Sequence, residues 1–437
     1  MTLTILLGII SIGILIFIHE LGHFLAARMA GIRVEVFSIG WGRGLISFRW
    51  KETKIQLGWI PFGGYCKMAG ELPSETTQEE PGNYYSSAPI KRIAVGLSGP
   101  VANYILAVVL FILIALIGYD IYTYSNMIVL VKEPLGFSSG ITPAMKAGLK
   151  DGDVILEING RKIRHWDEIT EVISRSPLKP LKMKVLRDNR VIELTIVPEI
   201  DRETGRGLIG IYPWVEPEVG KVVEGGPADR AGFKEGDIIV SVDGKKIRNQ
   251  IEFYEAIKGK SYYTVNVVVN RNGNLLTLKL VPEKVEEFDS PGFFFKQIKV
   301  RTPSYPFPDA VLKGVDKSVE ALVDTIRGIG LLVSGKIKAR TAIAGPAKLI
   351  YLSGVIAREG IVYFFQVMGY ISIAFFIINL VPFPALDGSH ITIALYEMIT
   401  RRRPNLQLVH RIQTFGFLFL LVLLVFVTIN DISSFFK

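Results

Sequence analysis

The chain has 437 residues, of which 49% are hydrophobic, and its mean hydropathy is positive at +0.35. This composition disfavours a purely soluble protein, so part of the chain is expected to lie in a bilayer. The formal charge of +9 does not favour nucleic acid as a partner, because the basic residues are spread among apolar segments without a base-stacking motif. The single cysteine, Cys66, excludes an intrachain disulfide.

Four stretches are long and apolar enough, or nearly so, to cross the roughly 30 Å hydrocarbon core of a bilayer. The first has no preceding basic segment and no small-residue cleavage site, so we expect it to be retained rather than removed as a signal peptide. The sequence therefore predicts a polytopic α-helical membrane protein. The predicted spans are residues 3–30, 95–118, 361–382 and 412–430.

The first span carries the run His19-Glu20-Leu21-Gly22-His23. Histidines four residues apart project from one face of a helix, so both can bind one tetrahedral metal ion. Glu20 would then lie beside the open position of the metal, where a carboxylate can take a proton from water. The alternative is a set of helix-end residues that reach the interface, which would not require two histidines in register. The pattern favours a hydrolytic metal site.

Residues 34–68, just after the first span, alternate apolar and polar side chains and are rich in glycine. We predict short strands with turns at residues 51–52 and 61–64, which form a membrane-associated β-hairpin or small sheet. Strands at membrane depth require protein or a water-filled cavity to satisfy their backbone. A hairpin that lies on the headgroups is the alternative.

The second span opens with Gly99 and Pro100, small or kinking residues that favour close packing against the first span. Asn103 follows one turn later. A buried asparagine in a helix bundle needs a hydrogen-bond partner, so we expect one for Asn103.

The segment after the second span contains one repeat at an offset of about 84 residues. Residues 143–160 match residues 227–244 in the pattern Pro-Ala-x-x-Ala-Gly-x-x-x-Gly-Asp-x-Ile, closed by Asn-Gly or Asp-Gly. This pattern resembles that of bacterial PDZ domains. We therefore predict two inserted PDZ-like α+β domains, at residues 119–203 and 204–285.

PDZ domains bind an extended peptide as an added strand and hold its terminal carboxylate in a glycine-containing turn. The candidate turn, assigned to the second copy, is Leu208-Ile209-Gly210-Ile211, and Leu135-Gly136-Phe137 is a weaker candidate in the first copy. Extracytoplasmic peptide tails are the expected ligands. The alternative is that the two domains are spacers that screen access to the membrane.

Residues 286–359 are expected to be a linker that contains an amphipathic helix, before the second half of the membrane core at residues 360–437. A catalytic zinc needs a third protein ligand, and residues 24–31 offer no histidine or carboxylate. The inner end of the third span carries both Asp387 and His390. Either of these side chains could complete the site.

Lysine and arginine gather between the first and second spans and again between the third and fourth, where residues 401–403 are all arginine. The positive-inside rule places both of these loops in the cytoplasm. The two termini and the long segment 119–359 are then expected outside the cytoplasm.

These motifs together resemble the site-2 protease family, in its bacterial branch of RseP type. The resemblance rests on His19-Glu20-x-x-His23, on Asn-x-x-Pro-x-Pro-x-Leu-Asp-Gly at residues 379–388, and on the two PDZ-like copies between them. It covers nearly the whole chain and implies an intramembrane metalloprotease with one zinc ion. It also implies that Asp387 is the third ligand and that Glu20 is the catalytic base. Asn379 would help to hold substrate or the oxyanion, and His390 would support the site from behind or be structural.

The resemblance also implies a substrate, which is a single-span membrane protein already trimmed on its outer side. An anti-sigma factor and a remnant signal peptide are both possible, and the location is the bacterial inner membrane. The β region would pair with the unwound substrate strand, with Gly40, Gly42, Gly63 and Gly64 as the candidate positions.

Two other functions compete with this one. The first is a PDZ-based membrane scaffold or receptor without proteolytic activity, which an intact Glu20 and a full ligand set disfavour. The second is a protease for soluble outer proteins, which the predicted cytoplasmic side of the metal disfavours.

Overall fold

The computed structural model describes residues 2–71, 80–131, 141–201, 204–285, 288–335 and 345–435. The chain folds as two compact units, one of Met1–Tyr119 with Pro303–Lys437 and the other of Asp120–Thr302. We call the first the helical unit and the second the repeat unit.

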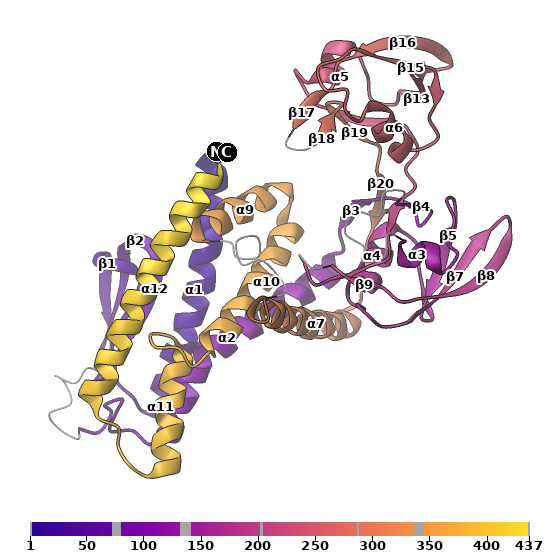
Figure 1. The fold of residues 1–437 in the computed structure, drawn as a ribbon. Coiled ribbons are helices and arrows are strands. Elements are labelled where there is room, and N and C mark those ends of the chain that lie inside the picture. Colours follow the sequence, from indigo (N-terminus) through magenta and orange to yellow (C-terminus); the bar gives the residue numbers. More distant parts are fainter. Residues whose placement is uncertain are drawn as a thin grey trace. The chain divides into compact units, whose positions relative to one another are not determined.

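The helical unit is built from long apolar helices. Its described helices are α1 (Thr2–Ala30), α2 (Pro89–Ile117), α7 (Phe307–Val333), α9 (Pro346–Glu359), α10 (Ile361–Asn379), α11 (Asp387–Thr400) and α12 (Leu406–Phe435). By length and composition, α1, α2, α10 and residues Leu406–Ile429 of α12 can each cross a membrane, which confirms four candidate spans. The second helix begins at Pro89, earlier than the predicted residue 95. The helix α2 packs against four of the others, α1, α7, α10 and α11 (Figure 1).

Small residues set the spacing between these helices. A Cβ added at Gly22 of α1 would lie 2.4 Å from the carbonyl oxygen of Ser98 on α2, and one at Gly8 would lie 2.0 Å from the carbonyl oxygen of Ile350 on α9. Lipid tails are as apolar as leucine, so helices in a bilayer gain most from close backbone approach. Glycine at these positions therefore holds α1 tightly against both neighbours.

An irregular hairpin follows α1, made of β1 (Val34–Trp50) and β2 (Thr53–Met68). Residues 34–39 lie between two parts of β2 and pair with residues 54–57 as well as with residues 64–68. Residues 64–68 therefore form an edge, with no further strand beside them among the described residues. The far part of the hairpin exposes large apolar side chains, namely Leu45, Ile46, Phe48, Trp50 and Trp59.

The sequence repeat of the repeat unit corresponds to two four-stranded sheets with the same strand order, β6-β5-β7-β8 and β14-β13-β15-β16. Outside the repeats, β3 (Asp120–Thr123) pairs with β20 (Ile298–Arg301). The first repeat contains β4 (Ile128–Leu130), α3 (Pro143–Lys146), β5 (Val154–Ile158), β6 (Arg161–Lys162), α4 (Trp166–Ser174), β7 (Leu181–Arg187), β8 (Arg190–Ile196), β9 (Glu199–Ile200), β10 (Gly207–Leu208) and β11 (Ile211–Pro213). The second contains β12 (Val219–Val222), α5 (Pro227–Ala231), β13 (Ile238–Val242), β14 (Lys245–Lys246), α6 (Gln250–Ile257), β15 (Val265–Arg271), β16 (Asn274–Leu280), β17 (Glu283–Val285), β18 (Phe288–Ser290) and β19 (Phe293–Phe295).

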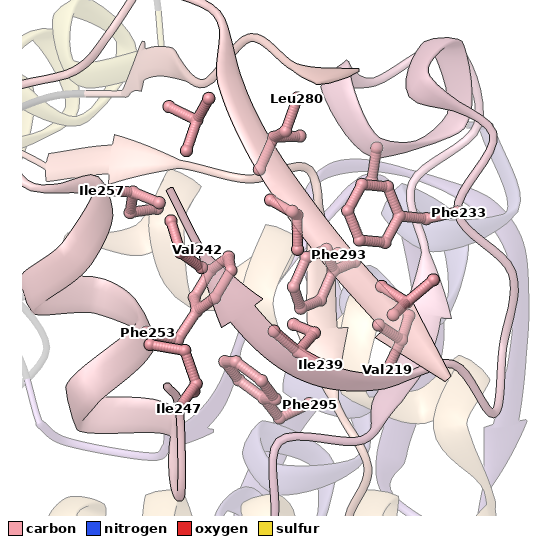
Figure 2. Close-up of a cluster of buried hydrophobic side chains, with 14 of the residues drawn as sticks. Val219, Phe233, Ile239, Val242, Ile247, Phe253, Ile257, Leu280, Phe293 and Phe295 are labelled. Atoms are coloured by element: carbon pink, nitrogen blue, oxygen red, sulfur yellow. The ribbon is translucent and has the colours of Figure 1, made fainter. Parts of the chain in front are cut away.

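The core of the second repeat is rich in phenylalanine. Phe253 is fully buried, and its ring centroid lies 5.5 Å from those of both Phe293 and Phe295 (Figure 2). Phe233, which follows the repeated Ala-Gly pair, stacks on Phe293 with ring centroids 5.6 Å apart. Residues 293–295 therefore belong to the core of this repeat, although we expected the domain to end at residue 285.

The boundary between the repeats also differs from the predicted one. Ile209 is buried in the hydrophobic cluster of the first repeat, and β11 pairs with β4 of that repeat. The turn Leu208–Ile211, which we assigned to the second copy, thus lies in the first. Its counterpart in the second repeat is the turn before β19, because β19 pairs with β12 as β11 does with β4. The weaker candidate, Leu135-Gly136-Phe137, lies outside the described residues.

Each repeat contains the same ion pair, which explains the aspartate of the repeated Gly-Asp. The Arg187 guanidinium donates to both carboxylate oxygens of Asp153 at 2.7 Å and to the Gly148 carbonyl. In the second repeat, Arg271 contacts Asp237 in the same bidentate way. Both aspartates are almost fully buried, so each needs its arginine.

This pairing makes the stability of the second repeat sensitive to acid. Burial of the Asp237 carboxyl raises its pKa, but hydrogen bonds from Arg271 and the Lys234 N–H outweigh burial and leave the pKa below its ordinary value. The stabilisation is therefore complete above about pH 4, the unfolded pKa, and is lost as pH falls through the folded pKa. Hydrogen exchange of β13 and β15 in the full chain, corrected for intrinsic rates, should show protection falling only below about pH 4.

The control is Asp237→Asn, which should lower the free energy of unfolding of this repeat at pH 7 by about 2 kcal/mol and flatten its acid dependence. An equally steep acid dependence in Asp237→Asn would assign the effect to other groups.

Candidate metal centre

Three predicted ligands from two distant segments meet inside the helical unit. His19 Nε2 lies 3.2 Å from His23 Nε2 and 3.0 Å from Asp387 Oδ2, and His23 Nε2 lies 3.3 Å from Asp387 Oδ1. Ligand atoms about 2.0–2.1 Å from one tetrahedral zinc ion lie about 3.3 Å from each other. Asp387 Oδ2 is also buried without a hydrogen bond of good geometry among the described residues. The donor set and its spacing therefore fit a zinc ion.

The second helix holds His23 in position. The His23 ring contacts the Val95 carbonyl oxygen through Nδ1 at 2.8 Å, and only an N–H can donate there. Nε2 is then free of its proton and available to a metal. Gly99, one turn further along α2, leaves room for the ring, because a Cβ there would lie 2.2 Å from His23 Nε2. Gly99 of the second span thus borders the site as well as allowing close helix packing.

Asn103 on α2 is the partner of His19. Its side-chain amide lies 3.2 Å from His19 Nδ1, and it is fully buried. The amide nitrogen is placed toward the ring and Oδ1 has no partner among the described residues, whereas the opposite amide orientation would let Oδ1 accept from His19 Nδ1–H. That orientation frees His19 Nε2 for a metal, as for His23. The sequence showed that Asn103 needed a partner but not which one.

Asp387 is the first residue of α11 and is reached through a tight turn. Ala385 has a positive φ of 73°, and its N–H donates to Oε1 of Gln413 on α12. Gln413 Nε2 also donates to Ser389 Oγ at 2.7 Å, so one side chain joins both sides of Asp387. At Gly388, a Cβ would lie 2.3 Å from the Val381 carbonyl oxygen. Sequence reasoning did not identify Gln413, which lies 24 residues after Ser389.

Glu20 lines the same cavity as the three ligands. The cavity has a volume of about 150 Å³, and the sheet edge contributes Tyr65, Cys66 and Met68 to its wall. Glu20 packs against this edge, because a Cβ at Gly64 would lie 3.0 Å from Glu20 Cγ. The cavity thus places a carboxylate, three ligands and a strand edge around one small space.

The four glycines predicted for strand pairing have different surroundings. Gly40, Gly42 and Gly63 have positive φ between 84° and 91°, and added Cβ atoms at Gly42 and Gly63 would collide with tryptophan side chains. These three glycines therefore shape the hairpin itself. Only Gly64 lies on the edge that borders the cavity.

Of the two remaining predicted residues, one lies on the cavity wall and the other outside it. His390 lines the cavity and its ring centroid lies 6.2 Å from that of Tyr84, but it is not within the metal-binding cluster found among the described residues. Asn379 is the half-buried last residue of α10 and does not line the cavity.

Gly99 offers a selective test of the centre. Gly99→Ala should push His23 out of position, because no backbone movement of a few tenths of an ångström relieves a 2.2 Å approach. We expect zinc affinity, measured by competition with a chromophoric chelator, to fall by about 10- to 100-fold. Gly13→Ala in α1 is the matched control, since a Cβ there meets nothing within 4 Å. Equal zinc affinity in the two variants would contradict the inference that Gly99 leaves the space that the His23 ring needs.

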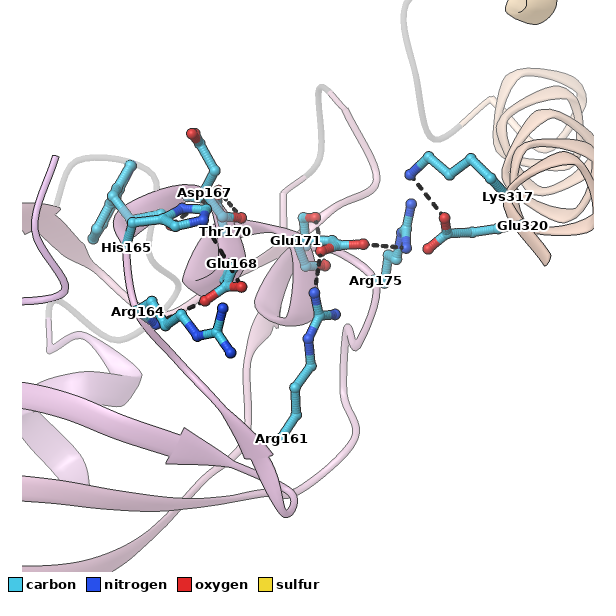
Figure 3. Close-up of polar contacts among 12 residues, drawn as sticks. Arg161, Arg164, His165, Asp167, Glu168, Thr170, Glu171, Arg175, Lys317 and Glu320 are labelled. Atoms are coloured by element: carbon cyan, nitrogen blue, oxygen red, sulfur yellow. Dashed lines mark hydrogen bonds and ion pairs between the residues drawn. The ribbon is translucent and has the colours of Figure 1, made fainter. Parts of the chain in front are cut away.

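The first repeat has a larger cavity of about 950 Å³, beside the turn Leu208–Ile211. Trp166, Ile169 and Ile173 of α4 line it on one side. Other residues of α4 are engaged in ion pairs, where Glu171 contacts Arg161 and Arg175 at 2.8 and 2.9 Å (Figure 3). The cavity thus lies between α4 and the turn Leu208–Ile211.

Comparison with known proteins identifies relatives over almost the full length. The model of peptidase family M50 matches residues 7–423. A "Putative zinc metalloprotease" of Treponema pallidum (strain Nichols) is 31% identical, with 99% of each chain covered. The "Regulator of sigma-E protease RseP" of Escherichia coli (strain K12) is 28% identical, with 97% of each covered. A solved HtrA3 PDZ domain bound to a phage-derived ligand is 21% identical over 19% of this chain and 88% of that one, and its TM-score of 0.13 carries no fold assignment.

Proposed function

The chain belongs to peptidase family M50, and from this premise we propose that His19, His23 and Asp387 hold its zinc ion while Glu20 moves the proton. The family and the names of the relatives make the chain a site-2-type zinc metalloprotease that works within the membrane. The observation that carries the proposed residue roles is the convergence of the three ligand atoms within 4.8 Å of one another, beside Glu20.

The proposed chemistry is hydrolysis of a peptide bond. Zinc, when bound, supplies a Lewis acid that polarises the scissile carbonyl and lowers the pKa of a water molecule. The Glu20 carboxylate accepts a proton from the attacking water and later donates it to the leaving amine nitrogen. Val95 and Asn103 keep the two imidazoles oriented with Nε2 toward the centre.

We propose that the strand edge at residues 64–68 presents the substrate. A transmembrane helix satisfies its peptide groups internally, so it must unwind before its carbonyl groups become accessible. An edge strand offers replacement N–H and C=O partners, and this edge contributes Tyr65 and Cys66 to the cavity wall. The exposed tryptophans and aliphatic side chains of the same hairpin support its contact with lipid. Asn379 would act on the substrate from outside the cavity lining.

The protein is a multi-pass protein of the inner membrane. We propose that its two arginine- and lysine-rich loops face the cytoplasm and that its termini and the repeat unit face the periplasm. The repeats are then two PDZ domains, and the groove of the first takes the tail of an extracytoplasmic peptide at Leu208–Ile211.

The proposed substrate is a single-span membrane protein already trimmed on its periplasmic side, such as an anti-sigma factor or a remnant signal peptide. The test uses the full chain purified in detergent and a single-span peptide with a long or a short outer segment. Cleavage should stop when zinc is chelated and resume when zinc is added. The peptide with the short outer segment should be cleaved faster than the one with the long segment. Zinc-dependent cleavage of soluble unfolded proteins, with no cleavage of the single-span peptide, would contradict the proposal.

A further inference from the structure

A buried ion pair joins α2 to α11, the helix that begins with Asp387. Arg92 is only 1% exposed and is the largest fully buried side chain among the described residues. Its Nη2 contacts Oε2 of Glu397 on the last turn of α11. Its Nε donates to the Ser87 carbonyl at 3.2 Å, and its guanidinium lies 5.5 Å from the Tyr85 ring centroid. The cation is therefore held from three sides.

The other end of α11 touches α2 just as closely. A Cβ at Gly96, one turn after Arg92, would lie 2.9 Å from Ile391 Cγ1 and 3.8 Å from the Asp387 carbonyl oxygen. Along α2, Arg92 binds Glu397, Val95 orients His23, and Asn103 contacts His19. One helix thus contacts both histidines and both ends of the helix that supplies the carboxylate.

The length of α11 makes its far end important for Asp387. Glu397 lies ten residues after Asp387, or roughly 15 Å along the axis at about 1.5 Å per residue. If the ion pair no longer held this end, α11 could tilt about its close contact at Gly96 and Ile391, which lies four residues or roughly 6 Å from Asp387. A tilt of about 4° there would move Asp387 by roughly 0.4 Å. Metal sites require ligand distances within about 0.2 Å of their preferred values. A tilt of a few degrees after loss of the ion pair therefore exceeds the tolerance of the metal site.

We propose that Arg92 and Glu397 form a positioning pair that sets the angle of α11 and so holds Asp387 at the two histidines. The proposal rests on the ligand assignment made under the proposed function. A mainly stabilising role is a poor explanation, because a buried ion pair replaced by well-packed apolar residues often costs a protein no stability. An ion pair differs from apolar packing in fixing direction, which is what a ligand-bearing helix needs.

The test compares four variants of the full chain in detergent: R92M, E397Q, the apolar double variant R92M/E397L and the charge swap R92E/E397R. Zinc affinity is measured by chelator competition, kcat and KM with a single-span peptide, and folding by circular dichroism. The first three should weaken zinc binding by about 10- to 100-fold, the range seen when outer partners of metal ligands are lost. The charge swap should recover part of that loss. R271M, which breaks the ion pair of the second repeat, is the matched control and should bind zinc as the wild type does.

Wild-type zinc affinity in folded R92M/E397L would overturn the proposal, because packing alone would then position α11. If R92M and E397Q misfold, the charge swap R92E/E397R decides. A folded charge swap that binds zinc no better than R92M/E397L would also overturn the proposal. His19→Ala and Asp387→Asn are measured in parallel. Unchanged zinc affinity in those two variants would defeat the ligand assignment itself, whereas loss there with no loss in R92M defeats only the positioning pair.

Discussion

Glu20→Gln is expected to abolish cleavage while leaving zinc bound. The substitution keeps the shape of the side chain and its packing against Gly64 but removes the only group beside the ligands that we assign to proton transfer. Loss of a positioned general base costs about 10²- to 10⁴-fold in rate. The affinity for zinc should be nearly unchanged, because Glu20 is not among the three ligands. The measurements are single-turnover cleavage of a single-span peptide and metal content by mass spectrometry.

Glu35→Gln is the matched control for this experiment. Glu35 is an exposed carboxylate on β1 that pairs with Lys67 at 2.8 Å, and its loss should leave the rate within about twofold because a surface ion pair contributes little. Cleavage by Glu20→Gln at the wild-type rate would remove Glu20 from the mechanism. Loss of zinc together with activity would instead make Glu20 a ligand.

Asp387→Asn should lose zinc as well as activity. An amide replaces a charged carboxylate at the third position, and zinc sites of this kind use three protein ligands. We expect zinc affinity to fall by more than about 100-fold, beyond the effect of losing an outer partner. Circular dichroism should show a folded protein, because the turn at Ala385 and the Gln413 contacts remain. Chelator competition gives the affinity directly.

Two further variants decide between the possible third ligands. His390→Ala should keep zinc, since His390 lies on the cavity wall outside the cluster of three. The control for replacing a carboxylate by an amide is Asp309→Asn. Asp309 is an exposed aspartate in the first turn of α7, so this variant should bind zinc as the wild type does. If His390→Ala lost zinc and Asp387→Asn kept it, the third ligand would be the histidine.

The helical scaffold explains why such a site can exist at membrane depth. Polar and charged groups are costly in a bilayer unless they face the bundle interior and find partners. Here each imidazole has a partner on α2, and the Asp387 turn has one on α12. Glycines at positions 22, 96 and 99 bring the backbones close enough for these contacts. The polar centre therefore depends on small residues as much as on its ligands.

Local pattern alone was enough to predict much of this protein. The four spans follow from hydropathy, the two histidines from their spacing on one helix, and the repeat from self-similarity. Each of these signals is contained within one segment, so it can be read without knowing what lies beside that segment. The short-range β pattern of residues 34–68 likewise predicted a hairpin. It did not predict that one part of β1 pairs with two separate parts of β2.

Contacts between distant segments were decided only by the tertiary structure. From their residue types and position alone, Asp387 and His390 were equal candidates for the third ligand, and the structure brings Asp387 against the histidines. The turn Leu208–Ile211 proved to close the first repeat, because its strand pairs with β4 about 80 residues earlier in the chain. Arg92 and Glu397 are 305 residues apart. A sequence pattern records which face of an element is apolar, but the partner of a polar side chain depends on which helices pack together.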